Sequence, residues 1–146
     1  MVIKQMRSEI FLDAAYAIAL SSSKDMYHKR AVLIAEELEA SKIPLITTHA
    51  VMLEIGNALS KNKYRQAGVK LLQALEQDPN ITVIPMSENL YNKAFRLYRE
   101  RSDKEWGLTD CVSFTVMRSR KISSALTADE HFKQAGFRAL LLEESQ

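Results

Sequence analysis

Short apolar runs and one-sided helical patterns alternate along this chain of 146 residues. The runs have the length and β-branched content of strands, and between them apolar residues recur every three or four positions, as on one face of a helix. The expected strands are 9–13, 43–48, 81–85, 123–127 and 138–142. The expected helices are 31–40, 49–61, 66–77, 88–101, 109–120 and 129–136. The run 81–85 is so uniformly apolar that we expect it to be buried, and a proline closes it.

This alternation predicts an α/β fold. Strands that are joined by helices pair in parallel, and a parallel sheet is covered on both faces. We expect a single domain over residues 1–146, with a central parallel sheet of about four to five strands flanked by helices on both faces. No internal repeat divides the chain, and the polar stretch 99–107 is expected to be a loop. In such sheets, sites form at the carboxyl ends of strands, where the strand order reverses.

Composition narrows the class of protein. Hydrophobic residues make up 47% of the chain and charged residues 26%, as in globular domains. The single cysteine, Cys111, cannot form an internal disulfide and is expected to be a small buried residue. No apolar stretch suffices for a signal peptide or a membrane span, so we expect a cytoplasmic location.

His28, His49 and His131 show no metal-ligand spacing and are expected at the surface. The net charge of +2 permits a polyanionic partner without requiring one.

Four acidic residues fall where this fold would place a site. Asp13 ends the first expected strand, Asp129 follows the fourth, and Asp110 opens a helix. Glu54 lies inside the second expected helix and can reach the same edge if that helix lies across it. Carboxylates gathered at a buried edge without cations repel one another, and a divalent metal ion is the most direct compensation.

Helix capping is the alternative explanation for these acids. Asp13 could cap a following helix, and Asp110 could favour the positive end of its helix dipole, with Thr109 as the N-cap. The sequence TADE matches a capping box, in which Thr127 is the cap and Glu130 is its partner. Glu54 could be a solvated residue on the surface of its helix. Residue types and spacing leave both explanations open.

Four blocks of sequence carry these acids. They are IFLDAAYAIAL, LITTHAVMLEIGNAL, WGLTDCVSFTVM and ALTADEHFKQAGF. In this order and at this spacing they resemble the PIN-domain nucleases, and closely the VapC-like ribonuclease toxins of toxin–antitoxin pairs. The blocks are similar to the family's opening strand and acid, its glutamate-bearing helix and its two C-terminal aspartate motifs. The resemblance spans nearly the whole chain.

The resemblance implies an endoribonuclease that uses Mg²⁺ or Mn²⁺ to hydrolyse RNA phosphodiester bonds through Asp13, Glu54, Asp110 and Asp129. It implies Asp13 and Asp110 as metal ligands. Glu54 would bind the ion directly or through water, or orient the nucleophile. Asp129 would be either a further ligand or only a helix cap. Carboxylate oxygens are hard ligands that suit both ions.

Supporting residues and partners complete these expectations. Thr109 and Asn57 are candidates to fix the carboxylates by hydrogen bonds, and Thr48 is expected to cap the helix that carries Glu54. The resemblance implies a homodimer and a small antitoxin protein, with no membrane. Basic residues near 60–65, 96–101 and 118–121 are either phosphate contacts or solvated helix faces.

Other side chains near the motifs have two readings each. Trp106 could stack on an RNA base or form an apolar lid over the start of the next helix. Ser113 could face the cleft or pack in the core. Tyr91, Phe95 and Tyr98 share a helix face and belong either to the core or to a dimer interface.

Other classes of function compete with a toxin. A non-toxin RNA-processing nuclease of the same fold is one, and a catalytically inactive module that only binds RNA or protein is another. A phosphoacceptor receiver domain also uses an α/β sheet with clustered acids. A receiver needs paired acids after its first strand and a lysine after a late strand. Here Asp13 stands alone, and no lysine follows the strand 123–127.

Overall fold

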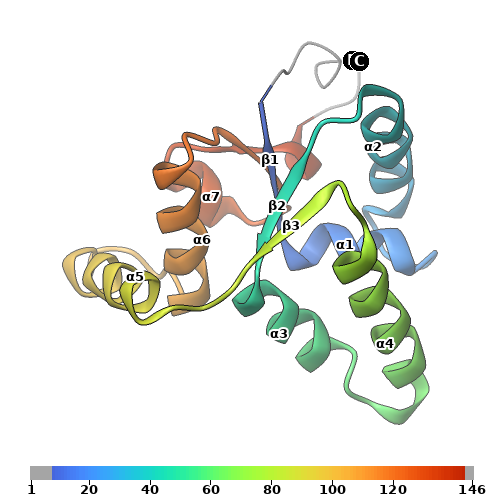
Figure 1. Cartoon of the computed structure of the whole chain (residues 1–146), viewed down its shortest axis with the longest axis horizontal. Helices are drawn as coiled ribbons and strands as arrows, with labels where there is room; N and C mark the ends of the chain where they lie inside the picture. The colour runs from blue at the N-terminus through green and yellow to red at the C-terminus, as the bar shows by residue number, and fades with distance from the viewer. Residues whose placement is uncertain (1–7, 144–146) are drawn as a thin grey trace.

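A five-stranded sheet organises residues 8–143, the part of the chain that the computed structural model describes. The strand order is β3-β2-β1-β4-β5, and every neighbouring pair is parallel (Figure 1). The strands are β1 (Ile10–Leu12), β2 (Leu45–Thr48), β3 (Ile81–Ile84), β4 (Ser124–Leu126) and β5 (Arg138–Ala139). The predicted α/β class, with its parallel sheet of four to five strands, is confirmed.

Helices cover both faces of this sheet. Figure 1 shows α5, α6 and α7 on one side and α1, α2 and α4 on the other, with α3 beyond the carboxyl end of β2. The helices are α1 (Ala14–Ser21), α2 (His28–Ser41), α3 (His49–Ala58), α4 (Asn62–Gln77), α5 (Glu88–Glu100), α6 (Leu108–Ser119) and α7 (Glu130–Gln134). Within the described residues, none of them has both the length and the apolar character that crossing a membrane requires.

The chain changes direction across the sheet at β1. From this central strand it runs outward through β2 to β3, and it then returns to the other side of β1 to add β4 and β5. The carboxyl ends of β1 and β4 therefore meet at the point where the strand order reverses. Leu12 pairs with Leu126, so the next residues, Asp13 and Thr127, leave the sheet side by side.

An aromatic cluster packs the two C-terminal motif helices against the sheet. The Phe114 ring of α6 lies edge-on to Trp106 and to Phe132 of α7, with ring centroids 5.0 Å apart in both pairs. Phe132 in turn lies 6.3 Å from Phe11 of β1, and all four rings are buried. Trp106 Nε1 donates to Gln134 Oε1 at 3.0 Å, which satisfies the buried indole. The reading of Trp106 as an apolar lid is confirmed.

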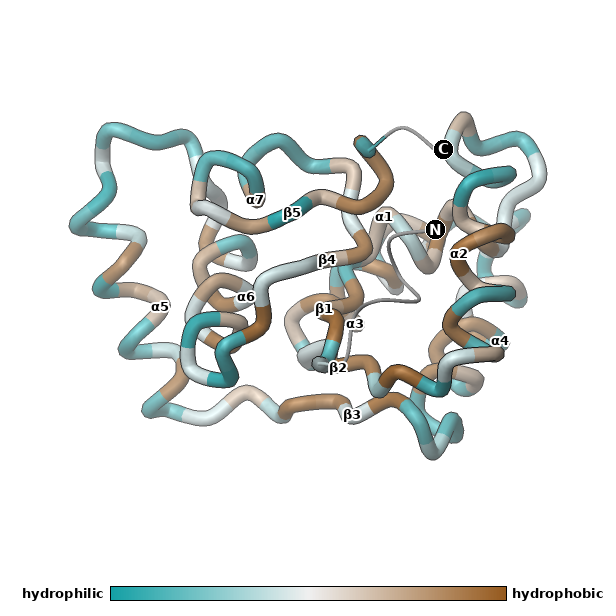
Figure 2. The backbone as a smooth tube through the Cα atoms, turned by 90° about the horizontal axis from the view of Figure 1, so that it is seen from above, coloured by the Kyte–Doolittle hydropathy of each residue, from teal (hydrophilic) through white to brown (hydrophobic). Residues whose placement is uncertain are grey.

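Two strand predictions were wrong in part. β3 was expected to be buried, but among the described residues it is an edge strand that pairs only with β2, and it is half-buried. Figure 2 shows that its positions are nevertheless hydrophobic, which explains the error. The last strand ends at Ala139 instead of reaching residue 142. There Leu140–Leu142 form a 3₁₀ helix, in which Glu143 N–H donates to Leu140 O at 3.4 Å, and Leu141 N–H donates to Thr127 O at 3.1 Å.

Several side chains can now be assigned. Cys111 and Ser113 are 0% and 1% exposed, which confirms the buried cysteine and places Ser113 in the core. Tyr91, Phe95 and Tyr98 are 44%, 41% and 47% exposed and stack in sequence along α5. The core reading of these three rings was therefore wrong, and the dimer interface stays a prediction.

Phe114→Ala should lower the free energy of unfolding by about 3–5 kcal/mol, because it removes a buried ring that packs against several others and leaves a cavity. Urea unfolding followed by circular dichroism measures the change. Tyr91→Ala removes an exposed ring and is the matched control, with an expected loss below about 1 kcal/mol. Equal losses in the two variants would contradict the central role of the aromatic cluster.

Candidate active site

Four elements deliver the predicted acids to the carboxyl edge of the sheet. Asp13 follows β1 and Asp129 stands at the N-cap of α7 after β4, while Asp110 lies in the first turn of α6. Glu54 lies in α3, which begins directly after β2. The hydroxyl of Thr48 accepts a hydrogen bond of 3.1 Å from the backbone of this helix, which confirms the predicted cap.

The charges of these acids act on one another. The pKa of Glu54 is raised to about 7, first by loss of hydration and then by the negative charges of Asp13, Asp110 and Asp129. Much of Glu54 is exposed, but the protein around its carboxyl group displaces enough water to make dehydration the larger cause. Mutual repulsion on this scale requires that the four carboxylates share one neighbourhood.

Asp13 is fixed by a threonine that follows the neighbouring strand. Thr127 Oγ1 donates to Asp13 Oδ2 at 2.7 Å and accepts from Asp129 N–H at 3.1 Å. Burial raises the pKa of Asp13 to about 6. The Thr127 bond and the Ala14 N–H oppose this rise, and the charges of two other acids add to it. Asp13 occupies the N-cap position of α1, but its side chain makes no capping bond there, so the capping explanation is not supported.

Asp110 closes the start of its own helix. The N-cap of α6 is Gly107, not Thr109 as predicted, because the helix already begins at Leu108. Glycine has no side chain to cap with, and only the return bond of a capping box forms, from Gly107 N–H to Asp110 Oδ2 at 3.1 Å. The pKa of Asp110 is raised by burial, and the bonds from His131 and Gly107 oppose the rise. The carboxylate therefore stabilises the helix and faces the site.

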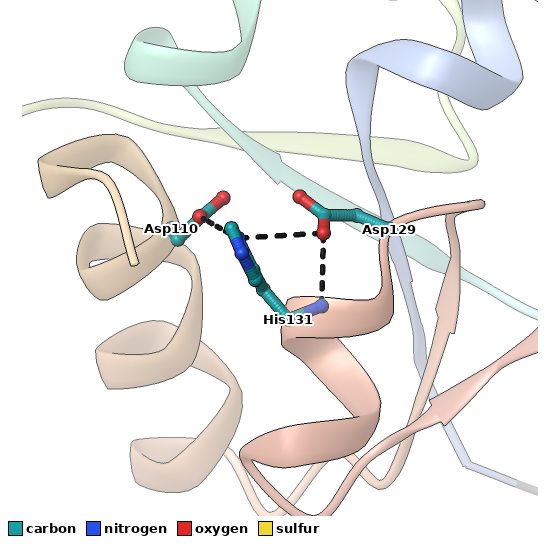
Figure 3. Close-up of side chains that lie close together, drawn as sticks. All are labelled: Asp110, Asp129 and His131. Carbon is teal, nitrogen blue, oxygen red and sulfur yellow. Dashed lines mark hydrogen bonds and ion pairs between the residues drawn. The ribbon is translucent and has the colours of Figure 1, made fainter. Parts of the chain in front are cut away.

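His131 is a site residue that the sequence reading missed. Its Nδ1 lies 3.0 Å from Asp110 Oδ2 and 3.4 Å from Asp129 Oδ1, between the two carboxylates (Figure 3). The expectation of a plain surface position was wrong for this residue, since the side chain is 30% exposed and packed into the acidic cluster. Its position two residues after Asp129, at the start of a helix, was the signal available in the sequence.

The predicted capping box at the start of α7 does not form. Asp129, not Thr127, is the N-cap, and its Oδ1 accepts from His131 N–H at 2.8 Å. Glu130, the expected partner of the box, instead forms an exposed ion pair with Lys133 at 3.6 Å. The hydroxyl of Thr127 accepts from Asp129 N–H and donates to Asp13. Asp129 combines a capping role with a place in the acidic cluster.

Thr109 and Asn57 were expected to orient the carboxylates. Among the described residues, the hydrogen bonds to the four acids include none from these two side chains, so their role stays a prediction. The bond that does orient Asp13 comes from Thr127. A second threonine fixes the backbone directly before Asp13: the buried Thr47 Oγ1 of β2 donates to Leu12 O at 2.8 Å.

The donor set suits a hard divalent cation. Within residues 8–143, the salt bridges to Lys or Arg side chains include none with the four site acids. Carboxylate oxygens are the preferred ligands of Mg²⁺ and Mn²⁺. Burial is the first cause of the raised pKa of Glu54, and the negative charges of Asp13, Asp110 and Asp129 add to the rise. A cation placed among the acids would relieve the part of the rise that comes from repulsion.

Comparison with known proteins agrees with the fold. Residues 10–138 match the family model of the PIN domain. The chain belongs to the PIN domain family. The family resemblance of the four sequence blocks is thus confirmed, and this PIN domain accounts for most of the chain.

Individual relatives extend this result. The chain is 29% identical over 129 residues to the 23S rRNA-specific endonuclease VapC20 of Mycobacterium tuberculosis. The aligned region covers 88% of this chain and 95% of that protein. The crystal structure of Mycobacterium tuberculosis VapC20, described as a sarcin–ricin loop cleaving toxin, matches with a TM-score of 0.76 at 28% identity over 88% of this chain and 95% of that one.

A more distant structure shares the fold. VapBC2 from Rickettsia felis, solved bound to a DNA fragment from its promoter, matches this PIN domain with a TM-score of 0.64 at 13% identity. The match covers 90% of this chain and 96% of the other. At this identity the likeness establishes a common fold alone.

Asp13→Asn should stabilise the metal-free protein by an amount that grows from about pH 4 to about pH 7. Asp13 has a folded pKa of about 6 against an ordinary value of 3.8. Its contribution to stability is therefore fully present below the unfolded pKa and is lost as the pH rises through the folded pKa. At pH 7.5 the variant should be more stable by on the order of 2 kcal/mol.

Thermal and urea unfolding in EDTA across this pH range make the measurement. Glu36→Gln, which neutralises an exposed carboxylate on α2, is the matched control and should follow the wild type at every pH. A gain in stability for Asp13→Asn that is constant with pH, or that shrinks as the pH rises, would show that burial does not raise the pKa of Asp13.

Proposed function

We propose that this PIN domain is an endoribonuclease that hydrolyses RNA phosphodiester bonds with Mg²⁺ or Mn²⁺. One observation carries the proposal: four carboxylates from four separate elements gather at the sheet edge, where burial raises the pKa values of Asp13 and Glu54 and the charges of the neighbouring acids add to the rise. Such a cluster costs folding free energy without a cation, so a binding role for it is the simplest explanation. The likeness to VapC20, an endonuclease, supports the choice of reaction.

In this proposal, Asp13, Glu54 and Asp110 hold the ion, and Asp129 is a further ligand, direct or through water. The bound ion supplies a water of lowered pKa and positive charge beside the scissile phosphate. The chain contributes placement, since Thr127 holds Asp13 at 2.7 Å. Glu54, whose pKa is raised to about 7 in the metal-free site, orients the attacking water where it is not itself bound to the ion.

A polar cavity beside the acids supports binding of the RNA backbone. Its lining includes Arg99, Lys104, Trp106 and Gly107, and Gly107 is also the residue whose N–H holds Asp110. Contacts from Lys and Arg to phosphate supply affinity that is independent of sequence. We assign phosphates that flank the cleaved bond to this cavity, which borders the basic segment 96–101.

We also propose that the nuclease is a toxin that acts in the cytoplasm, forms a homodimer and is neutralised by a small antitoxin protein. The likeness to VapC20 supports the toxin role. Support for a protein partner comes from exposed apolar side chains, which include Leu53 at 69% and Val69 at 47% together with the three stacked rings of α5. A non-toxin RNA-processing nuclease is the alternative.

Purified protein should cleave RNA with Mg²⁺ or Mn²⁺ and stop when EDTA is added. Asp13→Asn and Asp110→Asn should each lower the cleavage rate by about 100-fold or more, because each removes a charged ligand. Gel analysis of single-stranded and structured RNA measures the rates, with Glu36→Gln as the control and circular dichroism as the test of folding. Cleavage at full rate in EDTA would rule out the metal mechanism.

Expression of the wild-type chain should arrest bacterial growth, whereas expression of Asp110→Asn should not. The arrest follows from RNA cleavage, so it should disappear with the activity of the acidic cluster. Growth curves after induction, with immunoblots to equalise protein levels, make the comparison. Harmless expression of an enzyme that is fully active in vitro would favour the RNA-processing alternative.

A further inference from the structure

His131 brings an imidazole nitrogen into a cluster otherwise made of oxygen. One donor atom from each of Asp110, Asp129 and His131 lies within 4.8 Å of the other two. Figure 3 shows the His131 ring extending from the first turn of α7 to a position between the carboxylates of Asp110 and Asp129. No part of the proposed hydrolysis uses this side chain.

The separations suit atoms that surround one ion. In an octahedral site with bonds of about 2.1 Å, adjacent donors lie about 3.0 Å apart and opposite donors about 4.2 Å apart. His131 Nδ1 is 3.0 Å from Asp110 Oδ2 and 3.4 Å from Asp129 Oδ1, close to the spacing of adjacent donors. The limit of 4.8 Å on the carboxylate pair accommodates either arrangement. Small side-chain adjustments would suffice to admit a cation.

The backbone holds His131 in place independently of its ring. Asp129 Oδ1 accepts from His131 N–H at 2.8 Å, which fixes the first turn of α7. The ring can therefore exchange its contact with Asp110 for a bond to a metal ion without releasing the helix. Nδ1 binds a metal through its lone pair when the proton of the neutral ring is on Nε2.

We propose that His131 is a nitrogen ligand of the bound ion and that it makes this site prefer Mn²⁺ to Mg²⁺. The inference rests on the proposed metal dependence and names the ion that the site selects. Mg²⁺ binds almost entirely through oxygen, whereas imidazole suits transition metals, among which Mn²⁺ also accepts carboxylates and water. One nitrogen among several carboxylates is the set that distinguishes these two ions.

Electron spin echo spectroscopy of the Mn²⁺-loaded protein tests the ligand directly, since a coordinated imidazole gives a ¹⁴N modulation. The wild-type protein should show the modulation. His131→Gln keeps an amide that can donate to Asp110 but offers no nitrogen lone pair, so the modulation should vanish. Calorimetry should then give a loss of about tenfold in Mn²⁺ affinity and a change below about twofold in Mg²⁺ affinity.

His49→Gln, an exposed histidine at the start of α3, is the matched control and should keep the wild-type spectrum and affinities. Bound Mn²⁺ and RNA cleavage without ¹⁴N modulation in the wild type would overturn the role of His131 and leave the proposed nuclease function standing. Failure to bind Mn²⁺ would overturn both, whereas ¹⁴N modulation without RNA cleavage would support the role of His131 and overturn the proposed nuclease function alone. The wild-type spectrum decides the question even if the glutamine variant fails to fold.

Discussion

Carboxylates that are partly buried and repel one another at one edge of a parallel sheet determine the chemistry of this site. The strand ends fix where Asp13 and Asp129 leave the sheet, and the aromatic cluster fixes α6 and hence Asp110. The surroundings respond with hydrogen bonds from the Thr127 hydroxyl and the Gly107 N–H and with the contact of the His131 ring to Asp110, which lower the cost of the charges without cancelling them. The excess negative charge that remains is what a cation would bind.

The fold was largely predictable because its signals are local. Apolar runs and helical periodicity depend on neighbouring residues, and they located every strand of the described sheet. The errors arose where a long-range contact decided the outcome. An apolar pattern cannot show that, within residues 8–143, β3 has a partner on one side only. It also cannot show that Leu140–Leu142, where Leu141 N–H donates to Thr127 O, form a 3₁₀ helix instead of a strand.

The candidate site was predictable to a different degree. The acids stand at strand ends and helix starts, which sequence patterns reveal, and the structure brings all four into mutual electrostatic contact. The groups that hold them were not predictable, since Thr127 and Asp13 are 114 positions apart and Asp110 and His131 are 21 apart. Capping rules misled at Thr127 because α7 begins two residues later than they assume: Asp129 caps this helix, and the lone pair of the Thr127 hydroxyl accepts from the Asp129 N–H.

The double use of the Thr127 hydroxyl limits which amino acids position 127 can hold. Its proton is committed to Asp13, and its lone pair is committed to the Asp129 backbone. Only serine can also donate and accept at a similar size. Valine has the same shape as threonine, but it would leave the Asp13 carboxylate and the Asp129 N–H without these hydrogen bonds beside a buried side chain. Evolutionary drift at this position should therefore be confined to two hydroxyl-bearing residues, and an alcohol there becomes a recognisable mark of an intact acidic edge.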